Sequence, residues 1–304
     1  MNRADQHHHH HAPPDYSRAF AAGVVLNVVF VVIEAVFGVL SDSLALLTDA
    51  GHNLSDVLGL LLAWGAAALA RRQPSPRRTY GYSRATIIAS LFSGLLLMGA
   101  VGAIGWEAVN RLVEPAQPVG STIMIVAAIG VVVNTATALF FLSGKDSDLN
   151  IRGAFLHMAA DAAVSLGVVA SGAAILWLGY GWIDPVISLM IAAVIFLSTW
   201  GLLRDSLNLA VDAVPRNVDP EAVRSYLSGL PGVQAIHDLH IWPLSTTDTA
   251  LTAHLVMDEF PADDCFLNDI AVALVERFAI NHPTIQLERR DSDVVCHQAL
   301  HCAE

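Results

Sequence analysis

The sequence predicts a membrane protein, an all-α bundle of six transmembrane helices followed by a small α+β domain. The first observation is composition, because 54% of the residues are hydrophobic, only 14% are charged and the mean hydropathy is +0.53. Soluble domains rarely combine these values. The second observation is a set of six apolar runs, each near or above the roughly 20 residues that span a bilayer. The third is a change after Arg204 to the pattern of a water-soluble domain.

The six runs predict the transmembrane helices in order, at residues 20–40, 44–70, 85–108, 119–142, 151–178 and 183–203. No small-residue cleavage site follows the first run, so we expect a span there and not a signal peptide. Positive charge gathers on one side of the membrane, which the positive-inside rule assigns to the cytoplasm together with both termini. The residues on that side are Arg71, Arg72, Arg77, Arg78, Arg84, Lys145, Arg152 and Arg204, against Arg111 alone on the other.

The last third of the chain predicts short helices and strands. Pro215 and Pro220 mark the junction with the membrane domain. Helices are expected at 221–230 and 264–281, and strands at 233–241, 249–257 and 284–288. The domain organisation is then a His-rich tail (1–16), a membrane domain (17–208), an α+β domain (209–290) and a Cys/His-containing tail (291–304).

The pattern His-x-x-x-Asp occurs twice inside apolar runs, as His52 with Asp56 in the second run and as His157 with Asp161 in the fifth. A spacing of four places both side chains of each motif on one face of a helix. An ionisable side chain within the hydrocarbon is costly, so its presence indicates a function.

Depths along the two helices predict that the motifs meet. His157 and Asp161 lie about 9 and 15 Å from the cytoplasmic start of the fifth run, in a core about 30 Å thick. His52 and Asp56 lie about 13 and 19 Å from the outer start of the antiparallel second run. Each His is therefore opposite an Asp of the other helix near the midplane. Two nitrogen and two carboxylate ligands suit Zn²⁺ best, and Co²⁺ is also compatible.

Two interpretations of these polar residues stand side by side. Each His-Asp pair is either half of a metal site or a buried hydrogen-bonded pair that joins helices, although two copies at matching depth exceed what helix packing requires. Asp49 has two interpretations. It is either a relay residue on the outer side or a residue that positions His52, or it is an ordinary charged residue at a solvated helix end. Glu34 and Asn27 are expected to be contacts between helices and not ligands.

Three segments together are similar to the cation diffusion facilitator family, and most similar to its zinc-transporting branch: residues 43–56, 156–161 and 237–242. The resemblance runs from residue 20 to about residue 288. It implies a homodimeric metal/proton antiporter of a bacterial inner membrane, with His52, Asp56, His157 and Asp161 as the transport site. It also implies a ferredoxin-like cytoplasmic domain that dimerises.

The resemblance further implies a regulatory zinc site in the cytoplasmic domain, formed by His237, His254, His282 and Glu288. Histidine is also common at solvated strand ends, which is the alternative interpretation. His240 differs from His237 by an odd number within one strand, so we expect the two to face opposite sides and His240 to be structural. The arginine-rich connection at 71–78 predicts lipid contacts and no metal site.

The two tails offer further metal ligands. Cys296 and Cys302 lie beside two histidines, and Cys/His tracts of this kind bind zinc in other proteins. The five-His run at 7–11 is either a native metal-capturing segment or an expression tag. Cys265 is expected to be an ordinary small side chain.

The motifs are compatible with three classes of function. The first is a secondary transporter that exports Zn²⁺, with Cd²⁺ and Co²⁺ as related cargo, in exchange for protons. The second is an intramembrane metalloenzyme, which we disfavour because the chain has no His-Glu-x-x-His helix and no Gly-x-Ser-x-Gly turn. The third is a membrane metal sensor without transport. No nucleotide-phosphate loop is present, so ATP drive is not expected, and neither is a nucleic-acid partner.

Overall fold

The computed structural model describes residues 17–114, 116–142, 149–261, 263 and 265–290, with side chains omitted at 17–24, 141 and 149–154. It confirms the six membrane helices. Their bounds are α1 Ser17–Leu40, α2 Leu44–Ala70, α3 Ala85–Val113, α4 Gly120–Phe141, α5 Leu149–Leu178 and α6 Ile183–Ala210. Five of the described helices are long and apolar enough to cross a membrane, and Val25–Leu40 is a shorter apolar helix.

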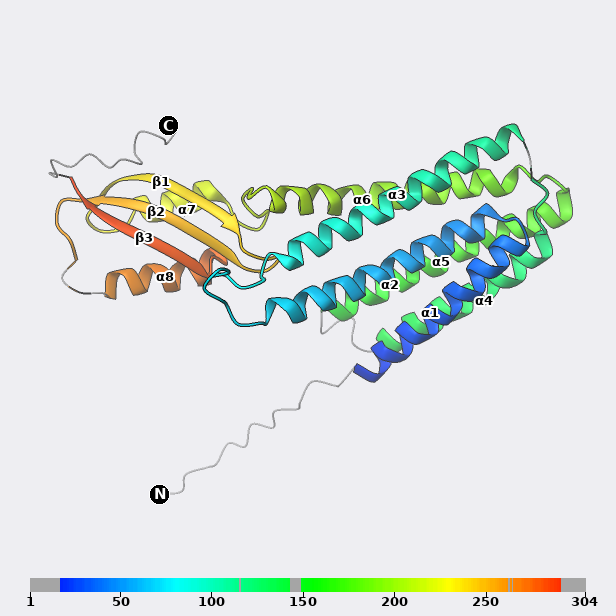
Figure 1. The fold of residues 1–304 in the computed structure, drawn as a ribbon, viewed down its shortest axis with the longest axis horizontal. Coiled ribbons are helices and arrows are strands. Elements are labelled where there is room, and N and C mark those ends of the chain that lie inside the picture. The colour runs from blue at the N-terminus through cyan, green and yellow to red at the C-terminus, as the bar shows by residue number, and fades with distance from the viewer. Residues whose placement is uncertain (1–16, 115, 143–148, 262, 264, 291–304) are drawn as a thin grey trace, which may run out of the picture. The chain divides into compact units, whose positions relative to one another are not determined.

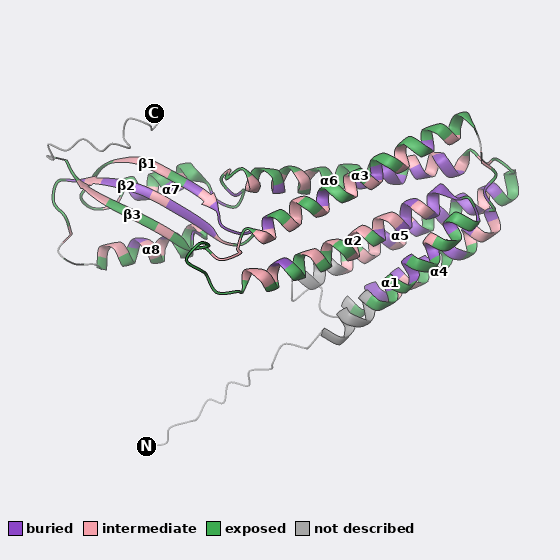
Figure 2. Ribbon diagram, in the orientation of Figure 1, coloured by how far each residue is buried: buried purple, intermediate pink, exposed green. Residues whose placement is uncertain are grey.

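Helices α3 and α6 continue past the ends that hydropathy predicts, to Val113 and Ala210. The apolar signal stops at the first charged residues, but the backbone hydrogen bonds of a helix do not depend on the membrane boundary. Much of the surface of the helices is exposed, as Figure 2 shows, and many of the exposed side chains are large and apolar, among them Val25, Leu61 and Trp177. Trp106 and Trp177, each more than 70% exposed, lie near the ends of α3 and α5, where tryptophan prefers the membrane interface.

The chain divides into two compact units. The first comprises residues 1–57 and 100–195, and the second comprises residues 58–99 and 196–304. In the first unit, α1 packs against α4 and α4 against α5. A Cβ atom on Gly172 of α5 would lie 2.6 Å from the Met124 backbone nitrogen of α4. Glycine therefore permits the closest approach of these two helices.

A buried carboxylate ties the start of α6 to the start of α2 in the first unit. Asp184 accepts hydrogen bonds from Ser43 Oγ and the Leu44 backbone nitrogen, both at 2.6 Å, and from the Ala45 nitrogen at 3.3 Å. The two backbone donors are unpaired amides of the first turn of α2, which a carboxylate stabilises. Asp184 thus caps a helix to which it does not belong.

The second unit contains the α+β domain, and the order of its elements confirms the predicted class. The elements are α7 Pro220–Ser228, β1 Val233–Pro243, β2 Thr249–Met257, α8 Cys265–Phe278 and β3 His282–Arg289. The central strand β2 pairs antiparallel with β1 and parallel with β3. Both helices pack against one face of this sheet (Figure 1), where Leu227, Leu251 and Leu274 belong to a single hydrophobic core.

A β-bulge in β1 overturns the expectation that His237 and His240 face opposite sides. His237 pairs with His254 but His240 pairs with Thr252, so the two β1 residues between these pairs, Asp238 and Leu239, oppose Ala253 of β2 alone. The extra residue is accommodated at Asp238, whose backbone is left-handed with φ 53°. A bulge shifts the alternation of side chains by one. His237 and His240 therefore lie on the same face, the one that α7 and α8 leave open.

Candidate metal centre

The structure brings His52, Asp56, His157 and Asp161 together within the first unit. The His52 Nε2 atom lies 3.5 Å from an oxygen of Asp56 and 3.5 Å from an oxygen of Asp161. The His157 Nε2 atom lies 3.3 Å from Asp56 and 3.6 Å from Asp161. Each imidazole thus contacts one carboxylate of its own helix and one of the other helix. We call this arrangement the four-residue ring.

The spacings within the four-residue ring suit a small divalent cation better than direct hydrogen bonds. Strong N–H···O contacts to carboxylates are about 2.7–2.9 Å, whereas the four His–Asp separations are 3.3–3.6 Å. Adjacent donors around a tetrahedral zinc ion with bonds of about 2.0–2.1 Å lie about 3.3–3.5 Å apart. The four adjacent His–Asp separations are therefore close to those of neighbouring zinc ligands.

Burial adds an electrostatic reason for a cation at the four-residue ring. The Asp161 side chain is only 3% exposed. One oxygen each of Asp56 and Asp161 and the Nδ1 atom of His52 make no hydrogen bond to any described residue. Buried polar atoms without partners are costly. A divalent ion would neutralise both carboxylates and satisfy their oxygens at once.

Asp49 lies one turn before His52 on α2 and is fully buried, which excludes the interpretation of a solvated helix end. Its two oxygens accept hydrogen bonds from Asn53 Nδ2 at 3.4 Å and from Ser165 Oγ on α5 at 2.9 Å. Glu34 of α1 faces Asp49 and Asn53. Asn27 contacts the Met158 sulfur of α5 at 3.8 Å, which is the expected contact between helices.

A second cluster lies in the α+β domain, on the open face of the sheet. His237 Nε2 is 2.9 Å from one oxygen of Glu288, and His254 Nδ1 is 2.8 Å from the other. Ligand atoms of the three residues all lie within 4.8 Å of one another. The donor set of two imidazoles and one carboxylate is chemically suited to Zn²⁺, which usually takes four ligands. We call these three residues the cytoplasmic cluster.

The structure does not bring His282 to the cytoplasmic cluster. His282 begins β3 and pairs with Ala250, while Glu288 pairs with Val256 near the other end of the strand. Six residues of a strand span about 20 Å. The His282 ring packs instead against Tyr80, with ring centroids 5.4 Å apart. The sequence did not predict this separation, because the expected strand begins at residue 284, whereas β3 begins at His282.

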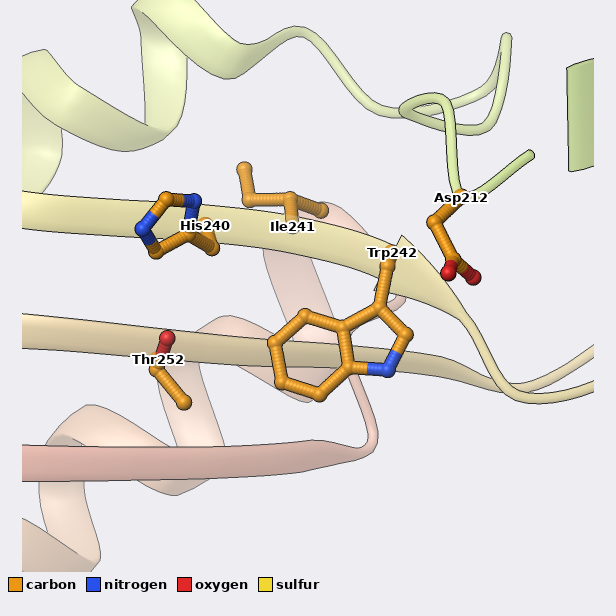
Figure 3. A pocket seen from close by; sticks show the side chains of 5 residues that line it. All are labelled: Asp212, His240, Ile241, Trp242 and Thr252. Atoms are coloured by element: carbon orange, nitrogen blue, oxygen red, sulfur yellow. The ribbon is translucent and has the colours of Figure 1, made fainter. Parts of the chain in front are cut away.

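Asp238 is a neighbour of the cytoplasmic cluster that the sequence did not single out. Its carboxylate lies 2.9 Å from His240 Nε2 and 3.6 Å from His254 Nε2. His240 also lines a nearby pocket of about 430 Å³. Figure 3 shows His240 and Trp242 of β1 with Thr252 of β2 among the residues around this pocket.

The remaining candidate ligands lie outside the described residues. They are the His run at 7–11 and the tail cysteines Cys296 and Cys302. Cys265, at the start of α8, is exposed and makes no disulfide bond with a described residue.

Two family models match the chain. The cation efflux transmembrane domain matches residues 20–209. The cytoplasmic domain of cation efflux proteins matches residues 215–290. The two matches follow one another along the chain with a gap of a few residues.

Curated relatives match over most of their own length. The metal cation efflux system protein CzcD of Cupriavidus metallidurans is 36% identical over 91% of this chain and 88% of its own. A cadmium, cobalt and zinc/H(+)-K(+) antiporter of Bacillus subtilis is 35% identical over 88% of both chains. The zinc transporter ZitB of Escherichia coli is 32% identical over 95% of this chain and 93% of its own.

One solved structure, the metal-bound C-terminal domain of the CzcD transporter from Cupriavidus metallidurans, is 38% identical to this chain. It covers 23% of this chain and 99% of its own, with a TM-score of 0.22. The family models and the full-length relatives carry the assignment. The chain belongs to the cation efflux family, also called the cation diffusion facilitators, and is a multi-pass membrane protein.

Proposed function

We propose that this chain exports Zn²⁺, with Cd²⁺ and Co²⁺ as related cargo, in exchange for protons and by alternating access around the four-residue ring. The observation that carries the proposal is the contact of each ring histidine with an aspartate of the other helix, between α2 and α5. Full-length relatives named as zinc transporters or as cadmium, cobalt and zinc antiporters support the choice of cargo.

The chemistry of the ring explains why metal and proton would compete. Two aspartates supply two negative charges, which neutralise a divalent ion, and each imidazole binds metal only when neutral. Histidine ordinarily titrates near pH 6.5, so modest proton gradients shift this competition. Metal would bind from the cytoplasm as protons leave, and would leave on the other side as protons return.

Family membership also supports a proposal for the oligomeric state, the membrane and the orientation of the chain. We propose a homodimer in a bacterial inner membrane with both termini in the cytoplasm, a membrane domain over residues 17–208 and a cytoplasmic domain over residues 209–290. The family model for residues 215–290 is described as a cytoplasmic domain, which supports this orientation. The arginines of the 71–78 connection then face anionic lipid headgroups.

The cytoplasmic cluster favours a regulatory role for zinc in addition to transport. We propose that His237, His254 and Glu288 hold this ion, and we leave His282 out because it lies far along β3. A membrane metal sensor without transport is the second candidate function, and the same cluster is the observation in its favour. Both candidates bind zinc in the cytoplasmic domain, but only the transporter moves it.

Zinc flux into sealed proteoliposomes separates the two functions. Purified protein is reconstituted, a pH gradient is imposed, and internal zinc is followed with an impermeant fluorescent indicator. A transporter accumulates zinc and stops when an ionophore removes the gradient. A sensor binds zinc to the outside of the vesicle without raising the internal signal.

A further inference from the structure

Two carboxyl groups that the four-residue ring does not use face each other inside the first unit. Glu34 belongs to α1 and Asp49 to α2, and both residues are 0% exposed. The pair lies close to the end of each helix that adjoins the α1–α2 connection. Glu34 is six residues from the end of α1 and Asp49 is five from the start of α2, which gives depths of about 9 and 7.5 Å. The two carboxyl groups therefore share one level.

The hydrogen bonds of the two groups are unequal. Asp49 accepts from Asn53 and from Ser165, so both of its oxygens have donors. Neither oxygen of Glu34 makes a hydrogen bond to a described residue, although the group faces Asp49 and Asn53. An unpartnered carboxylate in a membrane interior is among the most costly groups a protein can bury.

The surrounding groups leave the pair with excess negative charge. His52 of α2 and Asp161 of α5 act on Asp49 through electrostatics. Asn53 and Ser165 are neutral, and so are Asn134 and Thr137, the buried polar residues of α4. No Lys or Arg lies in α2 or α4, and the one in α1, Arg18, is sixteen residues from Glu34, about 24 Å along the helix. Two facing carboxylates in such surroundings do not both ionise, and a shared proton resolves the conflict.

We propose that Glu34 and Asp49 form a proton-binding site, in which the two carboxyl groups hold one proton between them and release it to water when a divalent ion occupies the four-residue ring. Asp49 is three residues from His52, which corresponds to about 4.5 Å along α2. A cation in the four-residue ring, one helical turn along α2 from Asp49 and in a low-dielectric setting, stabilises the ionised pair. By reciprocity, protonation of the pair weakens metal binding.

The release step rests on the proposed transport function, whereas the shared proton does not. The Glu34→Gln variant exploits this difference. Glutamine has the shape of a protonated glutamate, and Asp49 with its two donors then ionises alone. The variant keeps the charge of the protonated pair but has lost the exchangeable proton. Asp49→Asn is the complementary variant, which leaves Glu34 without a carboxyl neighbour, and Glu107→Gln is the matched control at an exposed carboxylate paired with Arg111.

The first measurement is infrared spectroscopy of the zinc-free full-length protein in lipid at neutral pH. The wild type and Glu107→Gln should show the C=O stretch of a protonated carboxyl group. Glu34→Gln should lose it, because Asp49 keeps its two donors and ionises alone. Asp49→Asn should keep it, because the buried Glu34 has no donor to stabilise its ionised form. A wild-type spectrum without this band, or a band that persists unchanged in Glu34→Gln, overturns the proton-binding site whether or not the protein transports zinc.

The second measurement is the number of protons released per zinc ion bound, from calorimetry in buffers of different ionisation enthalpy. Glu34→Gln should release about one proton fewer per protomer than the wild type. The cytoplasmic cluster is identical in both proteins, so its contribution cancels. Equal proton release at equal zinc stoichiometry overturns the linkage. If the infrared band behaves as expected while no variant or wild type moves zinc, the transport proposal falls and the shared proton stands.

Discussion

His52 of α2 contacts Asp161 of α5, with 3.5 Å between the His52 Nε2 atom and a carboxylate oxygen. The reciprocal contact, from His157 of α5 to Asp56 of α2, is 3.3 Å. Two copies of one short motif on antiparallel helices thus form a closed ring of alternating imidazoles and carboxylates. A ring that is split evenly between two helices opens when those helices separate, which is the property that alternating access requires.

Replacing Asp161 by Ala should abolish zinc flux while a folded dimer remains. The variant loses one metal ligand and one of the two charges that neutralise the ion. Flux into proteoliposomes and size-exclusion chromatography measure the two properties. Asp56→Ala should behave alike, and Glu107→Ala is the control because Glu107 is an exposed carboxylate of α3. Wild-type flux in either ring variant would show that the ring does not carry the ion.

Replacing His52 by Asp should change metal selectivity. The ring would then hold one imidazole and three carboxylates, a harder set with one more negative charge. Mn²⁺ flux should rise relative to Zn²⁺, and the ratio of Cd²⁺ to Zn²⁺ flux should change as well. Competition assays at equal protein content measure these ratios. An unchanged metal profile would mean that His52 does not touch the ion.

Replacing His254 and Glu288 together by Ala should remove about one zinc ion per protomer from the cytoplasmic domain and weaken its self-association. Transport should persist with a lower apparent zinc affinity or rate, because a regulatory ion acts through its differential affinity for conformations. Metal analysis and flux measure the two effects.

The matched control for that double variant is His282→Ala, which should leave zinc stoichiometry unchanged, since His282 lies at the far end of β3. Loss of a zinc ion in His282→Ala would restore that residue to the site. Complete loss of transport in a well-folded double variant would place the cytoplasmic cluster on the obligatory ion path.

Replacing Gly172 by Ala should destabilise the packing of α4 against α5. The new methyl group would lie 2.6 Å from the Met124 nitrogen and 2.9 Å from the Gly120 carbonyl oxygen, so the backbones must separate. Overpacking of this kind costs about 1–3 kcal/mol of unfolding free energy. Gly167→Ala on the same helix is the control, because no described atom lies within 4 Å of its added Cβ. Thermal unfolding in detergent measures the effect. The melting temperature should be lower for Gly172→Ala than for the wild type, and unchanged for Gly167→Ala.

The features predicted well from the sequence are those with one dominant physical cause. Helix α2 has the predicted bounds, Leu44–Ala70, because bilayer thickness sets the length of an apolar run. Pairing of the two His-x-x-x-Asp motifs followed from helical rise and antiparallel direction. Each of these arguments uses geometry that regular helices keep over their whole length.

The features that the sequence did not predict depend on local irregularity or on tertiary packing. Alternation in β1 fails at Asp238, where a left-handed residue inserts a bulge and moves His240 to the face of His237. The pairing of Glu34 with Asp49 depends on how α1 rotates against α2, and the weak amphipathic pattern of α1 does not fix this rotation. The unequal hydrogen bonding of Glu34 and Asp49, which indicates a proton-binding pair, is likewise a property of the tertiary structure.

In the proposed transport cycle, one ion bound by the four-residue ring moves in exchange for protons. Simultaneous recording of zinc uptake and internal pH in proteoliposomes tests it most directly, with the wild type compared with Asp161→Ala. Zinc entry should drive proton exit in the wild type, a reversed pH gradient should reverse the zinc flux, and Asp161→Ala should show neither movement. Zinc flux in the wild type that leaves internal pH unchanged and ignores the gradient would contradict it.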